Sequence, residues 1–412
     1  MKHWLNITWK CLVGVIAAVV IMCATLMGLF RLCVPLVPGY REQAQNWASA
    51  ALGRPVSITS MGATWGLFGP ELTLEKVELL SQNRQRVLVT AREIRLGFTL
   101  TALVHGQFSR PSRVILIQPH LVLERDTDGS FAVPGLEGSL ELNHGHTDWR
   151  QMVVDIFAQD AEVLIRRGEV TVIDRRTPAT PLVISDIRLN LDNSADSHRI
   201  FGRMLLPPAL GVSLSFSGRI QGPGTMPDTW QWQGEVQASA LNLPRLLYYW
   251  PAYNGHFSSG LVDLRGAVFG AGMHMDQMQA TFNAQHVIAM RETSGTTGFS
   301  LLAGTVNWTR TANGWILGGN DIHMQRKQNI WPASNLDLHY IREQNGAASW
   351  SGSVSFLRLQ DIVTLTGWLP KEFSASTARL MRLSPRGDVR DAGFQALWNT
   401  KSFNTWSVHG RF

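Results

Sequence analysis

The sequence predicts a mainly β protein, in which one N-terminal transmembrane helix precedes an elongated, groove-forming antiparallel β-sheet of repeated units with a few short helices. Three observations support this class. Residues 11–30 form an uncharged apolar stretch, and most of the remaining chain alternates apolar and polar residues with a period of two. Charged residues make up 17% of the 412, below the usual ~25%, while 37 glycines supply turn positions.

The apolar stretch at residues 11–30 is long enough to cross a membrane, since a helix needs about 20 apolar residues to do so. A cleaved signal peptide has an apolar region of about 7–15 residues and a small-x-small cleavage site, whereas this stretch continues directly into Arg31. We therefore expect an uncleaved anchor with residues 1–10 as a cytoplasmic tail. Trp4, Trp9 and Lys10 are expected at the membrane interface, and the bulk of the chain outside the cytoplasm.

Two short helices are expected in the region from 31 to 160, which is otherwise predicted to be β. Residues 40–52 are rich in helix-forming residues and are followed by Gly53 and Pro55, which typically end a helix. Residues 149–158 are the second expected helix. Residues 161–412 are expected to form the repeated part of the sheet.

The clearest strand patterns lie near the start of this second region. Ile187, Leu189 and Leu191 alternate with polar residues, as do Val212, Leu214 and Phe216. Glycine- and asparagine-containing turns separate further segments of the same kind, which indicates a long antiparallel meander with one apolar face. The candidate residues for the lining of the apolar groove are therefore Ile187, Leu189, Leu191, Val212, Leu214 and Phe216.

Two similar segments, residues 241–251 and 357–370, each read as the end of a strand that runs into a short helix stopped by proline. This spacing favours an extended, repeating architecture over a closed catalytic domain.

The motifs of common enzyme classes are absent from the sequence, so we expect no catalytic residues, no metal and no cofactor. His144, His146 and Asp148 could imitate a metal site, but Thr147 or Asp148 is better explained as a helix N-cap. The net charge of +6 comes from scattered residues without a basic run, so no nucleic-acid partner is expected.

Several segments resemble a known family. They are VPLVPGYRE from Val34, LGRPVSIT from Leu52, WGLFGPELTL from Trp65, LVLERDTDGSF from Leu121 and LMRLSPRGDV from Leu380. On these residues the chain resembles the N-terminal portion of the YhdP family, within the AsmA-like proteins of Gram-negative envelopes.

This resemblance implies an inner-membrane protein whose periplasmic β-groove shelters phospholipid acyl chains between the inner and outer membranes. Such a protein would support the permeability barrier of the outer membrane, with the inner membrane and other envelope proteins as partners. Members of the family are longer than this chain, so the resemblance also implies a fragment, the product of a truncated gene, or a protein that needs a partner for the missing portion.

Two alternatives share these features. One is an envelope assembly or scaffold factor whose apolar β face binds another protein. The other is an anchored enzyme that acts on cell-wall glycans, against which the missing motifs count.

Overall fold

The computed structural model describes most of the chain in detail. The described residues are 31–32, 34–66, 69–99, 111–127, 131–133, 161–176, 180–248, 256–291, 295–342, 347–361, 386–399 and 402–411, together with short pieces between 14 and 28. By their contacts, the residues divide into two units, of which the first contains 1–147 and 160–179 and the second contains 148–159 and 180–412.

Unit 1 is a small sheet with one helical segment. Its described elements are the 3-10 helix η1 (Val34–Tyr40), helix α2 (Arg41–Leu52) and strands β1 (Val56–Gly66), β2 (Gly69–Leu80), β3 (Val87–Gly97), β4 (Arg113–Arg125), β5 (Phe131–Ala132) and β6 (Glu162–Asp174). Strands β1 to β4 pair in chain order as antiparallel neighbours, and the short β5 pairs with the end of β4.

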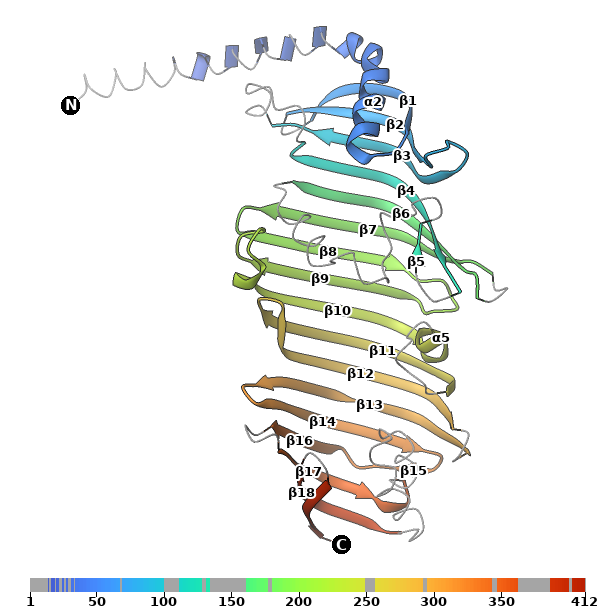
Figure 1. The fold of residues 1–412 in the computed structure, drawn as a ribbon, viewed down its shortest axis with the longest axis vertical. Helices are drawn as coiled ribbons and strands as arrows, with labels where there is room; N and C mark the ends of the chain where they lie inside the picture. The colour runs from blue at the N-terminus through green and yellow to red at the C-terminus, as the bar shows by residue number, and fades with distance from the viewer. Residues whose placement is uncertain are drawn as a thin grey trace, which may run out of the picture. The chain divides into compact units, whose positions relative to one another are not determined.

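Helix α2 confirms the helix predicted at residues 40–52, and it covers β1 (Figure 1). Gly53 ends the helix in the left-handed conformation with φ of 64°, as expected of a glycine at this position. The backbone N–H of Ile58 donates to the Gln45 side chain at 2.8 Å, and that of Val56 donates to the Ser49 hydroxyl at 2.9 Å. Helix α2 therefore satisfies hydrogen-bonding groups that β1 would otherwise expose at its edge.

The prediction of a purely antiparallel sheet is wrong at one position, because β4 and β6 run parallel. Parallel neighbours require a long connection that returns the chain to the same end of the sheet. The segment between Arg125 and Glu162 is long enough to do this, although residues 134–160, which include the helix predicted at 149–158, lie outside the described residues. The alternating pattern within a strand does not reveal the direction of its neighbour.

Unit 2 consists almost entirely of long strands. Its strands are β7 (Leu182–Ser194), β8 (Ser197–Leu205), β9 (Ser213–Gln221), β10 (Gln231–Asn242), β11 (His256–Ala271), β12 (His274–Arg291), β13 (Gly295–Thr311), β14 (Gly314–Arg326), β15 (Asn329–Ile330), β16 (Ser334–Arg342), β17 (Ala348–Arg358), β18 (Asp388–Asn399) and β19 (Ser402–Arg411). The 3-10 helix η2 (Pro227–Thr229) precedes β10, and helix α5 (Leu243–Tyr248) follows it.

Every strand of unit 2 pairs antiparallel with the next strand in the chain, except at the two-residue β15, where β14 also pairs directly with β16. Figure 1 shows β7 to β14 as successive rungs in chain order. The predicted antiparallel meander is therefore confirmed within this unit.

Several strands contain a residue with positive φ, which interrupts the alternation of their side chains. Examples are Asp186 in β7 (φ 46°), Ala240 in β10 (φ 48°), His286 in β12 (φ 51°) and Asp321 in β14 (φ 52°). The pairing register shifts at or beside these positions, as expected for β-bulges, which bend a strand and re-aim its side chains. At Ala240 the Asp263 carboxylate accepts the backbone N–H at 2.8 Å, which stabilises the bulge.

The predicted anchor is only partly covered by the described residues. Trp4, Trp9 and Lys10 lie outside them, as do many of the positions between 11 and 30. Among the residues that are described, no helix combines the length and apolar content needed to cross a membrane.

Candidate functional site

The strands of unit 2 place apolar residues opposite one another on one face of the sheet. Directly paired residues of neighbouring strands point to the same face, so the printed registers define rows that cross the sheet. One row, the central row, meets every strand of unit 2 except β15 and contains no polar side chain. Its members are Leu191, Ile200, Gly218, Gly234, Val268, Met278, Trp308, Leu317, Leu338, Gly352, Phe394 and Val408.

A second row lies two residues further along each strand, about 7 Å from the central row. It too is free of polar side chains. Its members are Leu189, Gly202, Phe216, Val236, Gly266, Ala280, Val306, Gly319, Leu336, Val354 and Ala392. The two rows together form a continuous apolar face, and we refer to them by that name.

The opposite face of the same strands is mostly polar. The row between the two apolar rows points to this other side and is dominated by serine, asparagine, glutamine and charged residues. Its members are Asn190, Phe201, Ser217, Glu235, Ala267, Gln279, Asn307, Gly318, Asp337, Ser353, Gly393 and His409. The sheet is therefore amphipathic across the whole unit.

Many residues of the apolar face remain partly exposed in the described structure. Leu191 is buried, but Ile200, Val268 and Trp308 are half-buried, and Phe394 is 37% exposed. In unit 1, by contrast, α2 contributes Ala44 to the core around Ile58. A long apolar face that the described residues leave half-open is a candidate binding surface.

Five of the six predicted groove residues point to the same side of the sheet as this apolar face. Leu189 and Leu191 on β7 and Phe216 on β9 belong to its rows, and Leu214 pairs with Met204 and Ala238 in the adjacent row. Ile187 follows the bulge at Asp186 and is half-buried. It lies two residues before Leu189, so its side chain points to the same side of the sheet. The role of these residues in binding stays a prediction.

Val212 differs from the other predicted residues. It lies just outside β9, next to the bulge at Ala240, and is 58% exposed. Its backbone donates to the carbonyl of Ser239 and accepts from Leu206, so it joins the strands through its main chain. The alternation of the sequence continues through Val212, whereas the regular strand begins one residue later.

Glycines on the apolar face make room for large side chains on the neighbouring strand. A Cβ atom on Gly202 would overlap the ring of Phe216, one on Gly270 the indole of Trp232, and one on Gly352 the ring of Phe394. Sequence reasoning treated the glycines as turn residues and missed this role, although a glycine at an apolar position of an alternating strand is a usable signal.

One end of the apolar face is closed by a packed core, which we call the closed end. Its buried members are Ala284, Val287, Phe299, Met324, Trp331 and Phe356. Leu243 of helix α5 packs against this cluster. The rings of Trp331 and Phe356 meet edge to face with centroids 5.4 Å apart. Such packing buries the apolar side chains of this cluster.

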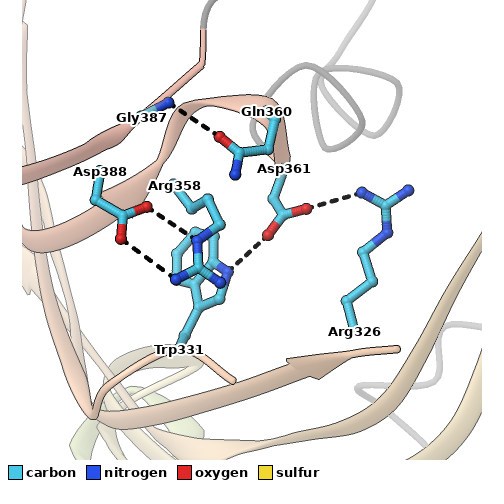
Figure 2. Close-up of polar contacts among 7 residues, drawn as sticks. All are labelled: Arg326, Trp331, Arg358, Gln360, Asp361, Gly387 and Asp388. Atoms are coloured by element: carbon cyan, nitrogen blue, oxygen red, sulfur yellow. Dashed lines mark hydrogen bonds and ion pairs between the residues drawn. The ribbon is translucent and has the colours of Figure 1, made fainter. Parts of the chain in front are cut away.

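A buried carboxylate fixes the closed end. Asp361 is 2% exposed and accepts a hydrogen bond from the Trp331 indole at 2.9 Å and one from Arg326 at 2.8 Å (Figure 2). Beside it, Arg358 donates two hydrogen bonds to Asp388 at 2.9 and 3.3 Å. The bond from Arg358 lowers the pKa of Asp388 below its ordinary value, and the same bond raises the pKa of Arg358. These contacts join β14, β17 and β18.

The opposite end of the strands carries a cluster of aromatic side chains, which we call the aromatic rim: Trp315, Tyr340 and Trp350. The three residues lie on adjacent strands in direct register, two residues from the central row. Trp315 and Tyr340 stack with centroids 5.7 Å apart, and Trp350 lies 4.9 Å from Tyr340 and 5.4 Å from Trp315. The apolar face therefore has two chemically different ends.

Unit 1 contains a second buried charged cluster, at the end of the parallel pair of β4 and β6. Arg125 lies 3.6 Å from Asp174, and both side chains are almost fully buried. Burial favours the neutral form of Asp174, but hydrogen bonds from Arg176 outweigh it, so the pKa of Asp174 lies below its ordinary value. The cluster links Arg125 and Asp174, which are directly paired residues of the two strands, and its role is structural.

In the part of the chain that the structure describes, no group of three or more histidine, cysteine, aspartate or glutamate side chains is arranged to hold a metal ion. The earlier candidates His144, His146 and Asp148 lie outside that part.

The fold and this surface define a class: a mainly β protein with a long amphipathic sheet, open on its apolar face in the described residues. Comparison with protein families then places it more narrowly. The chain belongs to the YhdP family, because the family model described as YhdP protein matches residues 1–412. Neither a curated protein nor a solved structure gave a match.

Proposed function

We propose that this protein is anchored in the inner membrane and holds phospholipid acyl chains on the apolar face of a periplasmic sheet. In this role it supports phospholipid transport between the inner and outer membranes and the permeability barrier of the outer membrane. The observation that carries the proposal is the central row, which stays apolar through twelve paired strands and is half-open to solvent. Membership of the YhdP family is consistent with a role in the cell envelope.

The physical basis is the hydrophobic effect. Moving an acyl chain from water to an apolar surface gains about 0.8 kcal/mol for each CH₂ group that becomes fully buried. Neighbouring strands lie about 4.8 Å apart and offer the same apolar chemistry at each step. An acyl chain therefore meets a similar free energy along the rows and can move between strands without leaving the apolar face. No catalytic step forms part of this proposal.

A crosslinking experiment on the full chain tests the proposal. A photoreactive amino acid placed at Leu214 is expected to capture lipid in bacterial membranes, because this side chain points to the apolar face. The same amino acid at the adjacent Ser215, which points to the polar face, is the matched control. Equal capture of lipid at both positions, or capture at Ser215 alone, would contradict the proposal.

A second readout is the lipid that copurifies with the full chain, measured by mass spectrometry. Leu189→Asp and Leu214→Asp place a charge on the apolar face and are expected to remove the bound phospholipid, whereas Ser215→Asp is expected to retain it. If the folded wild-type chain carries no lipid and the Leu214 crosslinker captures a protein, the surface serves an assembly or scaffold factor instead.

A further inference from the structure

The aromatic rim is flanked by two arginines that point to the same face. Arg310 on β13 is the direct register partner of Trp315 on β14, and Arg342 lies two residues beyond Tyr340 on β16. Both arginine side chains belong to exposed residues. The expected spacing of strands and residues puts their Cα atoms about 12 Å apart, with Arg310 beside Trp315 and Arg342 beside Tyr340.

Neither arginine has an acidic partner in the described part of the chain. Most arginines of unit 2 that form ion pairs do so within a strand or with a neighbouring strand, as Arg358 does with Asp388. Arg310 forms no ion pair with any described residue. The nearest acidic residue by register is Asp276, which lies opposite Arg310 on β12, next to the paired residues Gln277 and Thr309. Neither arginine therefore forms an ion pair within the described part of the chain.

Two polar atoms of the rim, on Trp315 and Tyr340, form no hydrogen bond with a described residue. The indole N–H groups of Trp232 and Trp331 donate to the carbonyl of Gly272 and to Asp361, respectively. By contrast, no hydrogen bond to a described residue is formed by the Trp315 indole or by the Tyr340 hydroxyl. Tryptophan and tyrosine with an apolar body and an unused polar tip suit a boundary between an apolar surface and water.

We propose that the aromatic rim with Arg310 and Arg342 is a binding site for the phosphate of a phospholipid headgroup. The inference rests on the proposed function and adds a location and an orientation. The phosphate accepts hydrogen bonds from the two guanidinium groups, from the Tyr340 hydroxyl and from the Trp315 indole. The acyl chains extend from there over the central row toward the closed end.

The two ends of the apolar face support this orientation. The closed end is filled by packed apolar side chains, and the Arg326 guanidinium there is paired with Asp361. The aromatic rim offers positive charge and hydrogen-bond donors within reach of the same rows. Guanidinium groups form strong, charge-assisted hydrogen bonds to phosphate, and arginine is widely used for this purpose.

The test compares two lipids with identical acyl chains, phosphatidylglycerol and diacylglycerol, for binding to the full chain in detergent. The wild-type protein is expected to bind phosphatidylglycerol more tightly, and this preference is expected to weaken as salt is added. The double variant Arg310→Gln/Arg342→Gln is expected to lose about tenfold or more in affinity for phosphatidylglycerol, while its affinity for diacylglycerol stays unchanged.

Arg265→Gln is the matched control, because Arg265 is an exposed arginine of β11 on the polar face. It is expected to bind both lipids as the wild type does. The double variant Arg310→Lys/Arg342→Lys keeps the charge and is expected to retain part of the preference, which separates a loss of charge from a loss of fold.

The inference is overturned if the glutamine double variant keeps the wild-type preference, or if the wild type binds both lipids equally. Binding of neither lipid by the folded wild type would instead overturn the proposed function. The two failures are therefore distinguishable in one set of measurements.

Discussion

Replacing Asp361 with alanine tests whether the buried carboxylate stabilises the closed end of the apolar face. The change leaves the Trp331 indole, which is buried, without its acceptor, and a buried donor without a partner costs about 1–3 kcal/mol. It also removes the ion pair with Arg326, whose side chain is 24% exposed and stays partly hydrated, so this loss adds about 1 kcal/mol. The expected loss in the free energy of unfolding is therefore about 2–4 kcal/mol.

The assay is urea denaturation of the full chain followed by circular dichroism, with hydrogen–deuterium exchange of peptides from β14 to β17 to localise the effect. Asp388→Ala serves as the control, because its partner is also an arginine but its own side chain is 45% exposed. This control is expected to cost about 1 kcal/mol or less. Equal losses for the two variants would refute the argument that burial at Asp361 sets the magnitude.

Three further predictions concern other parts of the chain. Gly270→Ala places a Cβ against the backbone carbonyl of His274 and is expected to destabilise unit 2 by about 1–3 kcal/mol, whereas Gly318→Ala, where a Cβ meets ordinary contacts, is expected to be nearly neutral in the same denaturation assay. Because the folded pKa of Asp174 is lowered, its contribution to stability is present above the unfolded pKa of about 3.9 and is lost as the pH falls through the folded value. Urea titrations from pH 5 to pH 2 should therefore show a weaker loss of stability in Asp174→Asn than in the wild type; an identical loss would contradict this assignment. Asp263→Ala removes the acceptor at the Ala240 bulge and is expected to raise hydrogen exchange at the end of β10, while the exposed Asp192→Ala should leave that exchange unchanged.

Much of the sheet could be predicted because a two-residue period directly reports which face a side chain occupies. The alternation from Ile187 to Leu191 gave both a strand and its buried face, and Gly53 marked the end of α2. Strand β8 was missed because arginines and Gly202 dilute the apolar signal there. The sequence contains no local signal for the direction of a partner strand, so the parallel pair of β4 and β6 was not foreseen.

The bulges explain why single positions were harder to predict than strands. At Ala240 one residue with positive φ is inserted. The buried positions of β10 therefore shift by one residue, so that Ala238 is buried before the bulge and Leu241 after it. Aspartate and histidine are enriched in the positive-φ conformation, but the alanine at position 240 reveals nothing of it in the sequence. The aromatic rim was hidden for another reason: Trp315, Tyr340 and Trp350 come together only through the pairing of three strands.

The pairing of each strand in unit 2 with its successor has a consequence for how such a protein can change in length. Contacts between strands are local in the chain, so a hairpin inserted at a turn would meet only its two neighbours and disturb little else. Each added hairpin would lengthen the sheet by two strand spacings, about 10 Å. Duplication of hairpins could in this way change the length of the apolar face without redesigning a core.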